Sequence, residues 1–406
     1  MTATVHVLLG ERPVGTISHL PGDASLFVFD ERFTADPGRP VLSQCYLDAR
    51  GELRTQPRVT RIRLPPWFSN LLPEGVLRTY LARRGGIHPD REFHLLALLG
   101  DDLPGAVRIV REPLPGPDRD ANEPNTSPPR DGPLRFSLAG VQLKFSALMG
   151  QHGGLTIPAS GIGGDWIVKL PSPTYPAVPE NEAMMLTLAG VVGIGVPEHR
   201  LVAIDSIEGL PELGPFSGKQ ALAVRRFDRS AAGRIHMEDL AQVFGLFPDD
   251  KYSKVGLARI AEMIGLVMGH DAAQDFVARV AFIVMTGNGD MHLKNWSLLY
   301  PDGRTPTLAP AYDLVSTVPY LPGERLALNF MGRKEFAVVT RERFRRFAER
   351  AALPEHETLA TVDRIVDGVR SSWPSIRRDG QVPTEIVERI DAHIRAMSAR
   401  MGRGSL

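Results

Sequence analysis

The sequence predicts an α+β protein whose first part is rich in strands and whose last part is mainly helical. Short runs of β-branched and aromatic residues bounded by glycine or proline, such as "TVHVLL" and "SLFVFD", indicate strands in the first 110 residues. Apolar patterns with helical spacing dominate after about residue 235. Residues 111–132, "REPLPGPDRDANEPNTSPPRDG", almost lack apolar side chains, so we predict that they form a flexible linker.

Individual elements follow from the same patterns. Two helices are expected at residues 72–86 and 92–100, the first ending at a glycine pair. From residue 133 the pattern indicates a hairpin turning at "GQHGG", strands at 165–171 and 220–229, and between them a helix that follows Pro179. The later elements are helices at 237–245, 255–269, 272–287 and within 339–406, with two short strands around Pro-Asp-Gly at 295–310.

Composition limits the classes of function. With 406 residues, 43% of them hydrophobic and 23% charged, the chain can form two or three ordinary globular domains. Its 47 Lys plus Arg residues balance 47 Asp plus Glu residues, so no overall field favours nucleic acid or membranes. The single cysteine, Cys45, excludes an internal disulfide and fits a reducing compartment. The chain shows no signal-peptide pattern and no uncharged apolar run of about 18 residues, so we expect a cytoplasmic protein without a membrane span.

A polar cluster follows the most apolar helix. The stretch "VARVAFIVM" leads directly into "TGNGDMHLKN", which contains Asp290, His292, Lys294 and Asn295. Burying such groups costs several kcal/mol unless they are paired or hold a ligand, so the cluster predicts a functional site. The alternative interpretation is that His292 and Lys294 lie on an exposed surface loop.

The spacing of the cluster indicates phosphoryl transfer. An Asp followed five positions later by an Asn, as Asp290 is by Asn295, is typical of a kinase catalytic loop. There the Asp accepts the proton of the attacking hydroxyl, and the Asn oxygen binds Mg²⁺. Asp313 in "APAYDLVS" follows a short hairpin, and we expect it on a strand end as a second metal ligand. The site lacks a cysteine and a second histidine at ligand spacing, which argues against zinc.

A phosphate-binding pair is predicted upstream. Lys169 ends the apolar strand "WIVKLP", and Glu182 lies in the first part of the next helix, an order typical of kinases. The alternative is a solvent-exposed lysine at a strand end and a glutamate interacting with the helix dipole. The sequence contains neither G-x-x-x-x-G-K-[ST] nor a complete G-x-G-x-x-G after a strand, so a P-loop enzyme is not expected.

Seven segments, in order, resemble one family. They are "FSLAGVQLKFS", "WIVKLP", "NEAMML", "AVRRFDR", "MEDLAQVFG", "GNGDMHLKN" and "LAPAYDL", and together they are similar to the HipA-type serine/threonine kinases, the toxins of bacterial HipBA modules. The resemblance implies a two-lobed protein-kinase-like fold with an additional N-terminal α/β subdomain. It places the subdomain at 1–110, the linker at 111–132, the small lobe at 133–228 and the helical lobe at 229–406.

The resemblance also implies the role of each site residue. Asp290 matches the catalytic residue, His292 and Lys294 belong to the same loop, and Lys294 would add a cation near the transferring phosphate. Asn295 and Asp313 match the Mg²⁺ ligands. Lys169 matches the lysine that binds the ATP phosphates, and the main chain of Arg225 to Phe227 would meet adenine. From the residues themselves we expect Glu182 to position Lys169, and Ala139 and Gly140 to let the backbone around Ser137 bend over the phosphates as a lid; the alternative is a plain, solvent-exposed strand serine at Ser137. Ser137 matches a serine that autophosphorylates and thereby switches the kinase off. The family often has an acidic residue where Arg225 stands, which matters only if a side chain binds the nucleotide.

The implied function is that of an ATP- and Mg²⁺-dependent toxin kinase. The substrate would be an aminoacyl-tRNA synthetase, such as glutamyl-tRNA synthetase, and its phosphorylation would cause growth arrest and persistence. The implied partner is a HipB-like helix-turn-helix antitoxin, with operator DNA bound only through the antitoxin complex.

Two other functions stay open at this point. A small-molecule phosphotransferase would use a similar loop, although that loop usually begins His-Gly-Asp, whereas Asn288 and Gly289 precede Asp290 here. A non-catalytic corepressor would use a basic patch, for which residues 332–350 are the candidate, with a solvated helix face as the alternative interpretation. Retention of all four core groups, at Lys169, Asp290, Asn295 and Asp313, argues against an inactive enzyme.

Overall fold

A computed structural model gives the fold, and it divides into two compact units. The described residues are 3–111, 144–149, 155–157, 163–210, 216, 218–378 and 381–403. The first unit comprises residues 1–167, 206–212 and 228–248, and the second comprises 168–205, 213–227 and 249–406. The predicted linker after residue 111, and the predicted site residues Ser137, Ala139 and Gly140, lie outside the described residues.

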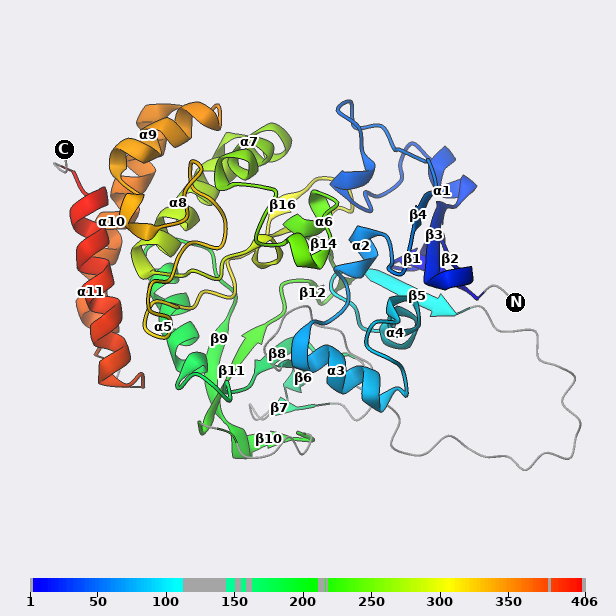
Figure 1. The fold of residues 1–406 in the computed structure, drawn as a ribbon, viewed down its shortest axis with the longest axis horizontal. Coiled ribbons are helices and arrows are strands. Elements are labelled where there is room, and N and C mark those ends of the chain that lie inside the picture. Colours follow the sequence, from blue (N-terminus) through cyan, green and yellow to red (C-terminus); the bar gives the residue numbers. More distant parts are fainter. Residues whose placement is uncertain are drawn as a thin grey trace, which may run out of the picture. The chain divides into compact units, whose positions relative to one another are not determined.

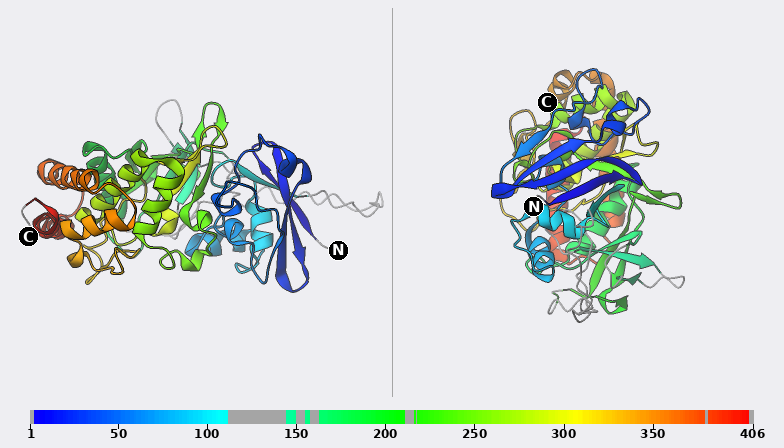
Figure 2. Two further views of the ribbon diagram at one scale, coloured as in Figure 1. Left: turned by 90° about the horizontal axis from the view of Figure 1, so that it is seen from above. Right: turned by 90° about the vertical axis from the view of Figure 1, so that its right-hand side faces the viewer.

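The first unit contains a five-stranded antiparallel sheet. Its strand order is β4 (Arg58–Thr60), β3 (Ala24–Phe29), β2 (Arg12–Leu20), β1 (Thr4–Leu9) and β5 (Val107–Arg111), and the blue strands lie side by side in Figures 1 and 2. Buried and more exposed residues alternate along β1, as expected for a sheet with one face in the core. The predicted strands at β1 and β3 are confirmed, whereas β2, β4 and β5 were not predicted.

Short helices complete this part of the first unit. They are α1 (Glu31–Ala35), α2 (Pro66–Ser69), α3 (Gly75–Arg84) and α4 (Glu92–Leu99), and the last two confirm the predicted helices. Phe27 of β3 contacts both Tyr46 and Phe68, with ring centroids 5.8 and 4.8 Å apart, so aromatic packing fills the core beside the sheet.

The remaining segments of the first unit are short. Strands β6 (Lys144–Met149) and β7 (Leu155–Thr156) pair antiparallel, which confirms the predicted hairpin, and β10 (Ile207–Glu208) pairs parallel with β7. Strands β12 (Arg229–Ser230) and β13 (Gly233–Arg234) form a second hairpin.

The helix predicted at 237–245 is wrong over its first half. Strand β14 (His236–Asp239) occupies those residues, and α6 covers only Leu240–Val243. The helix cannot begin earlier because Asp239 is its N-cap: the Asp239 side chain accepts from the Gln242 N–H, and the Gln242 side chain accepts from the Asp239 N–H.

Strands and one helix of the second unit provide two of the predicted site residues. Strand β8 (Trp166–Lys169) ends in this unit, and β11 (Gln220–Arg225) pairs antiparallel with β9 (His199–Ala203). Helix α5 (Val178–Val191) packs against β9 and β11. The strands predicted at 165–171 and 220–229 are confirmed as β8 and β11, and the predicted helix is α5, which begins just before Pro179; β9 was not predicted.

The rest of the second unit is mainly helical. Helix α8 (His270–Thr286) packs against α7 (Leu257–Met268), α10 (Glu355–Ile376) and α11 (Thr384–Met401), and α10 also packs against α9 (Arg341–Arg350). Figures 1 and 2 show the orange and red helices of this part. Strands β15 (Ser297–Tyr300) and β16 (Thr307–Leu308) form the predicted hairpin. No helix among the described residues is both long and apolar enough to span a bilayer.

Candidate active site

The candidate site begins where α8 ends. From Ala278 to Thr286 every residue of this helix is buried. Gly287 then takes a left-handed conformation with φ of 70°, and the Asn288 N–H donates to the Ile283 carbonyl at 2.9 Å. A residue with a Cβ would be strained at this φ and would collide with Val318. Glycine therefore ends the buried helix and turns the chain into the polar loop that follows.

Two side chains that sequence analysis did not assign hold this loop. Asn288 Oδ1 accepts from the Asp290 N–H at 3.0 Å, while Asn288 Nδ2 donates to the Asp313 carbonyl at 3.3 Å. Thr317 Oγ1 accepts from the Gly289 N–H at 2.7 Å. The loop that carries Asp290 is therefore fixed to the segment that carries Asp313. Asn288 and Thr317 have short polar side chains that are common in turns, so no sequence pattern distinguished them.

Asp290 presents its carboxylate at the protein surface. The Tyr252 hydroxyl donates to Oδ1 of Asp290 at 2.7 Å. The pKa of Asp290 is raised, mainly because the surrounding protein desolvates the carboxylate and also because Asp313 is negatively charged; the hydrogen bond from Tyr252 opposes this shift. Tyr252 is a further residue that sequence analysis missed, because it lies 38 positions away from Asp290 in the chain.

The other polar residues of the loop are buried. His292, Lys294 and Asn295 have exposed fractions of 6%, 6% and 7%, so the interpretation of His292 and Lys294 as exposed surface residues is wrong. Asn295 Nδ2 donates to the Asp290 carbonyl at 3.0 Å, which fixes the side-chain amide and leaves its oxygen as the acceptor. The Lys294 carbonyl accepts from the Tyr312 hydroxyl at 2.9 Å.

Lys169 bridges two carboxylates. Its Nζ lies 2.5 Å from Glu182 Oε1 and also pairs with Asp313 Oδ1. Lys169 and Glu182 are 5% and 1% exposed, so the interpretation of both as solvated residues is wrong. Burial alone would lower the pKa of Lys169, but the charges of Asp313 and Glu182 raise this pKa above its usual value. The lysine is therefore a fixed cation.

Asp313 is not on a strand, contrary to expectation. Strand β16 ends at Leu308, and Asp313 lies in an irregular segment with φ of 57°. A left-handed backbone costs a non-glycine residue roughly 1–2 kcal/mol, and such strain persists where surrounding contacts impose it. Here the Asn288 amide holds the Asp313 carbonyl, and Lys169 holds its carboxylate. The observed backbone thus directs this carboxylate towards Lys169.

Asn181 connects α5 to the segment after Asp313. It is fully buried, its Nδ2 donates to the Ser316 carbonyl at 2.9 Å and to the Tyr320 hydroxyl at 3.1 Å, and its Oδ1 accepts from the Ser316 N–H at 3.1 Å. Because Asn181 precedes Glu182 in α5, these bonds also fix the helix that provides the carboxylate for Lys169.

The predicted adenine-binding segment lies at the end of β11. Arg225 is exposed, and its guanidinium pairs with Glu198 at 3.2 Å. The Phe227 ring lies 5.3 Å from the Tyr312 ring, between centroids, and Tyr312 directly precedes Asp313. The structure therefore brings Phe227 near the Asp313 segment, while the side chain of Arg225 interacts with a surface carboxylate.

The donor set can be compared with that of common metal sites. Among the described residues, no group of three or more His, Cys, Asp or Glu side chains is arranged to hold a metal. Asn295 and Asp313 instead provide one amide oxygen and one carboxylate, and the Asp313 side chain remains 27% exposed. In kinases, Mg²⁺ is coordinated by a few protein oxygens together with phosphate oxygens and water. Asn295 and Asp313 therefore fit that ion.

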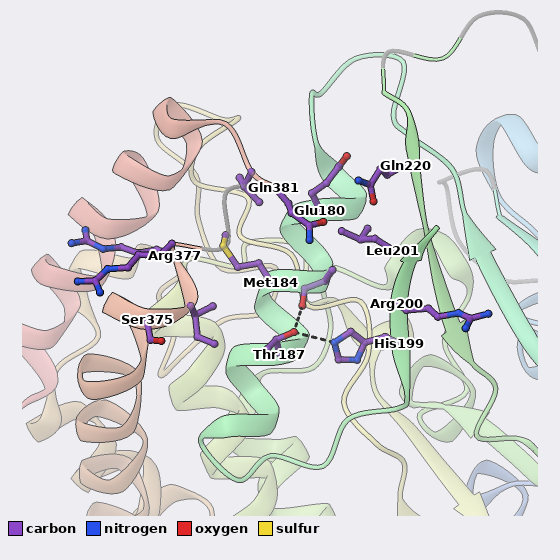
Figure 3. Close-up of a pocket in the computed structure, with 14 residues that line it drawn as sticks. Glu180, Met184, Thr187, His199, Arg200, Leu201, Gln220, Ser375, Arg377 and Gln381 are labelled. Carbon is purple, nitrogen blue, oxygen red and sulfur yellow. Dashed lines mark hydrogen bonds between the residues drawn. The ribbon is translucent and has the colours of Figure 1, made fainter. Parts of the chain in front are cut away.

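A cavity of about 660 Å³ lies beside a different face of α5 (Figure 3). Met184 and Thr187 line it, and Thr187 Oγ1 is 3.2 Å from Nε2 of His199 in β9. None of the described site residues predicted from sequence lines this cavity. Lys169 and Glu182 thus lie outside the lining of this cavity.

Ion pairs neutralise part of the basic segment 332–350. Arg341 pairs with Asp363 at 3.0 Å, and Arg345 pairs with Glu342 at 2.7 Å. These contacts favour the interpretation of the segment as a solvated helix face over that of a phosphate-binding patch.

Two family models match this chain. The HipA N-terminal domain family matches residues 5–110, and the HipA-like C-terminal domain family matches residues 136–373. The chain belongs to the HipA-like family. The putative kinase Y4dM of Sinorhizobium fredii is 46% identical over 95% of this chain and 95% of its own length. The HipA-like relatives also include the serine/threonine-protein kinase toxin HipA of Shewanella oneidensis, 27% identical over 79% of this chain and 76% of its own length.

A solved structure shares the fold. The structure of Shewanella oneidensis HipA with HipB and its operator DNA matches with a TM-score of 0.73 at 22% identity, covering 98% of this chain and 96% of that chain. The expected fold class is therefore confirmed: the chain has the two-lobed, protein-kinase-like α+β fold of HipA.

We predict that Asn181→Ala lowers the free energy of unfolding by about 2–3 kcal/mol, because it leaves the buried main chain of Ser316 without its partners. Urea-induced unfolding of the full chain measures the change. The matched control is Ser371→Ala, which removes an exposed hydroxyl from α10 and should change stability by less than about 0.5 kcal/mol. Equal effects of the two substitutions would show that Asn181 does not hold this part of the site.

Proposed function

We propose that this HipA-like chain is an ATP-dependent serine/threonine protein kinase and the toxin of a toxin–antitoxin module. The observation that carries the proposal is Lys169, buried between Glu182 and Asp313. Asn288 fixes the same Asp313 segment to the loop of Asp290. A fixed cation, two carboxylates and a candidate base in one unit are the groups that phosphoryl transfer requires. The relatives named as kinases support this proposal.

Each side chain has a proposed role. Asp290 accepts the proton of the attacking hydroxyl, and its raised pKa makes it a stronger base than an ordinary aspartate. Lys169 binds ATP phosphate oxygens, and Glu182 holds the lysine in place. Lys294 adds positive charge near the transferring phosphate, and buried His292 helps to shape the loop.

Further roles concern metal and nucleotide. Asn295 and Asp313 would hold Mg²⁺, which supplies positive charge that neutralises the phosphates. The main chain of Arg225 to Phe227 would bind adenine, so the exposed Arg225 side chain need not take part. A lid at Ala139 and Gly140, and autophosphorylation of Ser137 as an off switch, remain predictions on residues outside the described ranges.

The proposed partners follow the family. The protein substrate is an aminoacyl-tRNA synthetase, such as glutamyl-tRNA synthetase, whose phosphorylation arrests growth in the cytoplasm. The proposed antitoxin is a HipB-like helix-turn-helix protein, and operator DNA is bound through that complex. The Shewanella structure, which contains HipA, HipB and operator DNA, supports this assembly.

We predict that Asp290→Asn and Lys169→Met each lower phosphoryl transfer at least about 10²-fold, since each removes a group that acts on the reacting atoms. Transfer of label from γ-labelled ATP to the chain itself and to proteins of a bacterial lysate measures the effect. The control is Asp367→Asn, which removes an exposed carboxylate from α10 and should retain full activity. Wild-type activity in Asp290→Asn would exclude Asp290 as the base.

A second prediction concerns cells. Expression of the wild-type chain without an antitoxin should arrest growth, and expression of Asp290→Asn at the same level should not. Optical density after induction, with immunoblots for protein amount, provides the measurement. Equal arrest by both proteins would mean that toxicity does not depend on phosphoryl transfer.

A further inference from the structure

Tyr252 contacts the proposed base directly. Its hydroxyl donates to Asp290 Oδ1 at 2.7 Å, a usual length for an O–H···O hydrogen bond. Tyr252 lies in the segment before α7, and its side chain comes from outside the loop that holds Asp290. The contact therefore joins two elements that are separate in the chain.

The hydrogen bond from Tyr252 resembles the one that a substrate hydroxyl would make to Asp290. In phosphoryl transfer, the attacking hydroxyl of a serine or threonine donates a hydrogen bond to the carboxylate that takes its proton. The Tyr252 phenol makes that same kind of bond to Asp290. The phenol occupies one acceptor position of Oδ1, and an acceptor hydroxyl that uses this position must displace it.

We propose that Tyr252 is a gate at the acceptor site, which the aliphatic hydroxyl of a protein substrate must displace from Asp290. This inference rests on the proposed kinase function. Tyr252 would thus control entry of the acceptor hydroxyl to Asp290.

The main chain at Tyr252 is held by hydrogen bonds, whereas its side chain has room to rotate. The Tyr252 carbonyl accepts from Lys334 Nζ at 2.8 Å, and the preceding Lys251 carbonyl accepts from the Leu293 N–H at 3.1 Å. By contrast, the residue as a whole is 40% exposed. Rotation of the side chain alone can therefore move the phenol away from Asp290 without moving the loop.

Weak ring contacts hold the closed position. The Tyr252 ring meets the His292 ring edge-on, with centroids 5.0 Å apart, and Lys251 Nζ lies 5.4 Å from the Tyr252 centroid. Neither contact involves the hydroxyl, so Tyr252→Phe keeps both of them and removes the hydrogen bond to Asp290. Removing only the hydroxyl should shift the population towards the open position.

The test is Tyr252→Phe in the full chain, with Tyr175→Phe as the matched control. Tyr175 is also an exposed tyrosine of the second unit, 37% exposed, with its ring against Tyr320. ADP release is measured with Mg²⁺–ATP and increasing N-acetylserinamide as a small acceptor. Because apparent affinity falls with the closed fraction, Tyr252→Phe should lower the KM for N-acetylserinamide about tenfold with kcat unchanged. Tyr175→Phe should behave as wild type.

Other outcomes overturn the gate. A fall in kcat would show that the phenol assists Asp290, and an unchanged KM would show that it does not compete with the acceptor. Phosphate on Tyr252 after incubation with ATP would make this residue an acceptor instead.

A second readout does not need turnover. With 3-fluorotyrosine at position 252, the ¹⁹F resonance should shift when Mg²⁺–ATP and N-acetylserinamide are added together, because the phenol leaves Asp290. A resonance unchanged at saturating acceptor overturns the gate. Absence of ADP release from the wild-type chain alongside a shifted resonance would instead count against the proposed kinase function.

Discussion

Burial of the Lys169 ammonium between two carboxylates is the interaction on which the rest of the site depends. An isolated buried charge costs several kcal/mol, so the lysine can remain ionised only if Glu182 and Asp313 stay beside it. These three residues come from β8, α5 and the segment after β16. Because these three residues must meet, the side chains of Asn181 and Asn288 form hydrogen bonds with the main chain near Asp313 and hold it in place.

The same constraint accounts for the polar loop at the end of the most apolar helix. Helix α8 packs against α7, α10 and α11, so its buried C-terminal end is a rigid support for the loop that follows. Gly287 turns the chain there, and Asn288 connects the turn to Asp313. Backbone and amide contacts consequently place Asp290 without using its carboxylate. That carboxylate can therefore accept a hydrogen bond from a hydroxyl, and in this structure the hydroxyl is that of Tyr252.

Much of this arrangement could be predicted from sequence because it depends on local patterns. Lys169 at a strand end and Glu182 in the next helix followed from periodicity, and the structure pairs them. The left-handed backbone of Asp313 could not be predicted, because it results from contacts with Asn288 and Lys169 that are distant in the chain. Tyr252 escaped notice for the same reason, since an exposed tyrosine before a helix has no distinctive spacing. The start of α6 was misplaced because the predicted helix extended across Asp239, which is the N-cap in the structure.

The central proposal is that Asp313, together with Asn295, would hold the Mg²⁺ that accompanies ATP. Calorimetric titration of ATP, with and without Mg²⁺, into the wild-type chain and Asp313→Asn tests it most directly. The account predicts that Mg²⁺ strengthens ATP binding to the wild-type chain at least about tenfold, equivalent to about 1.4 kcal/mol, and has little effect on Asp313→Asn. The same Mg²⁺ dependence in both proteins would contradict the account, because the metal would then be bound without Asp313.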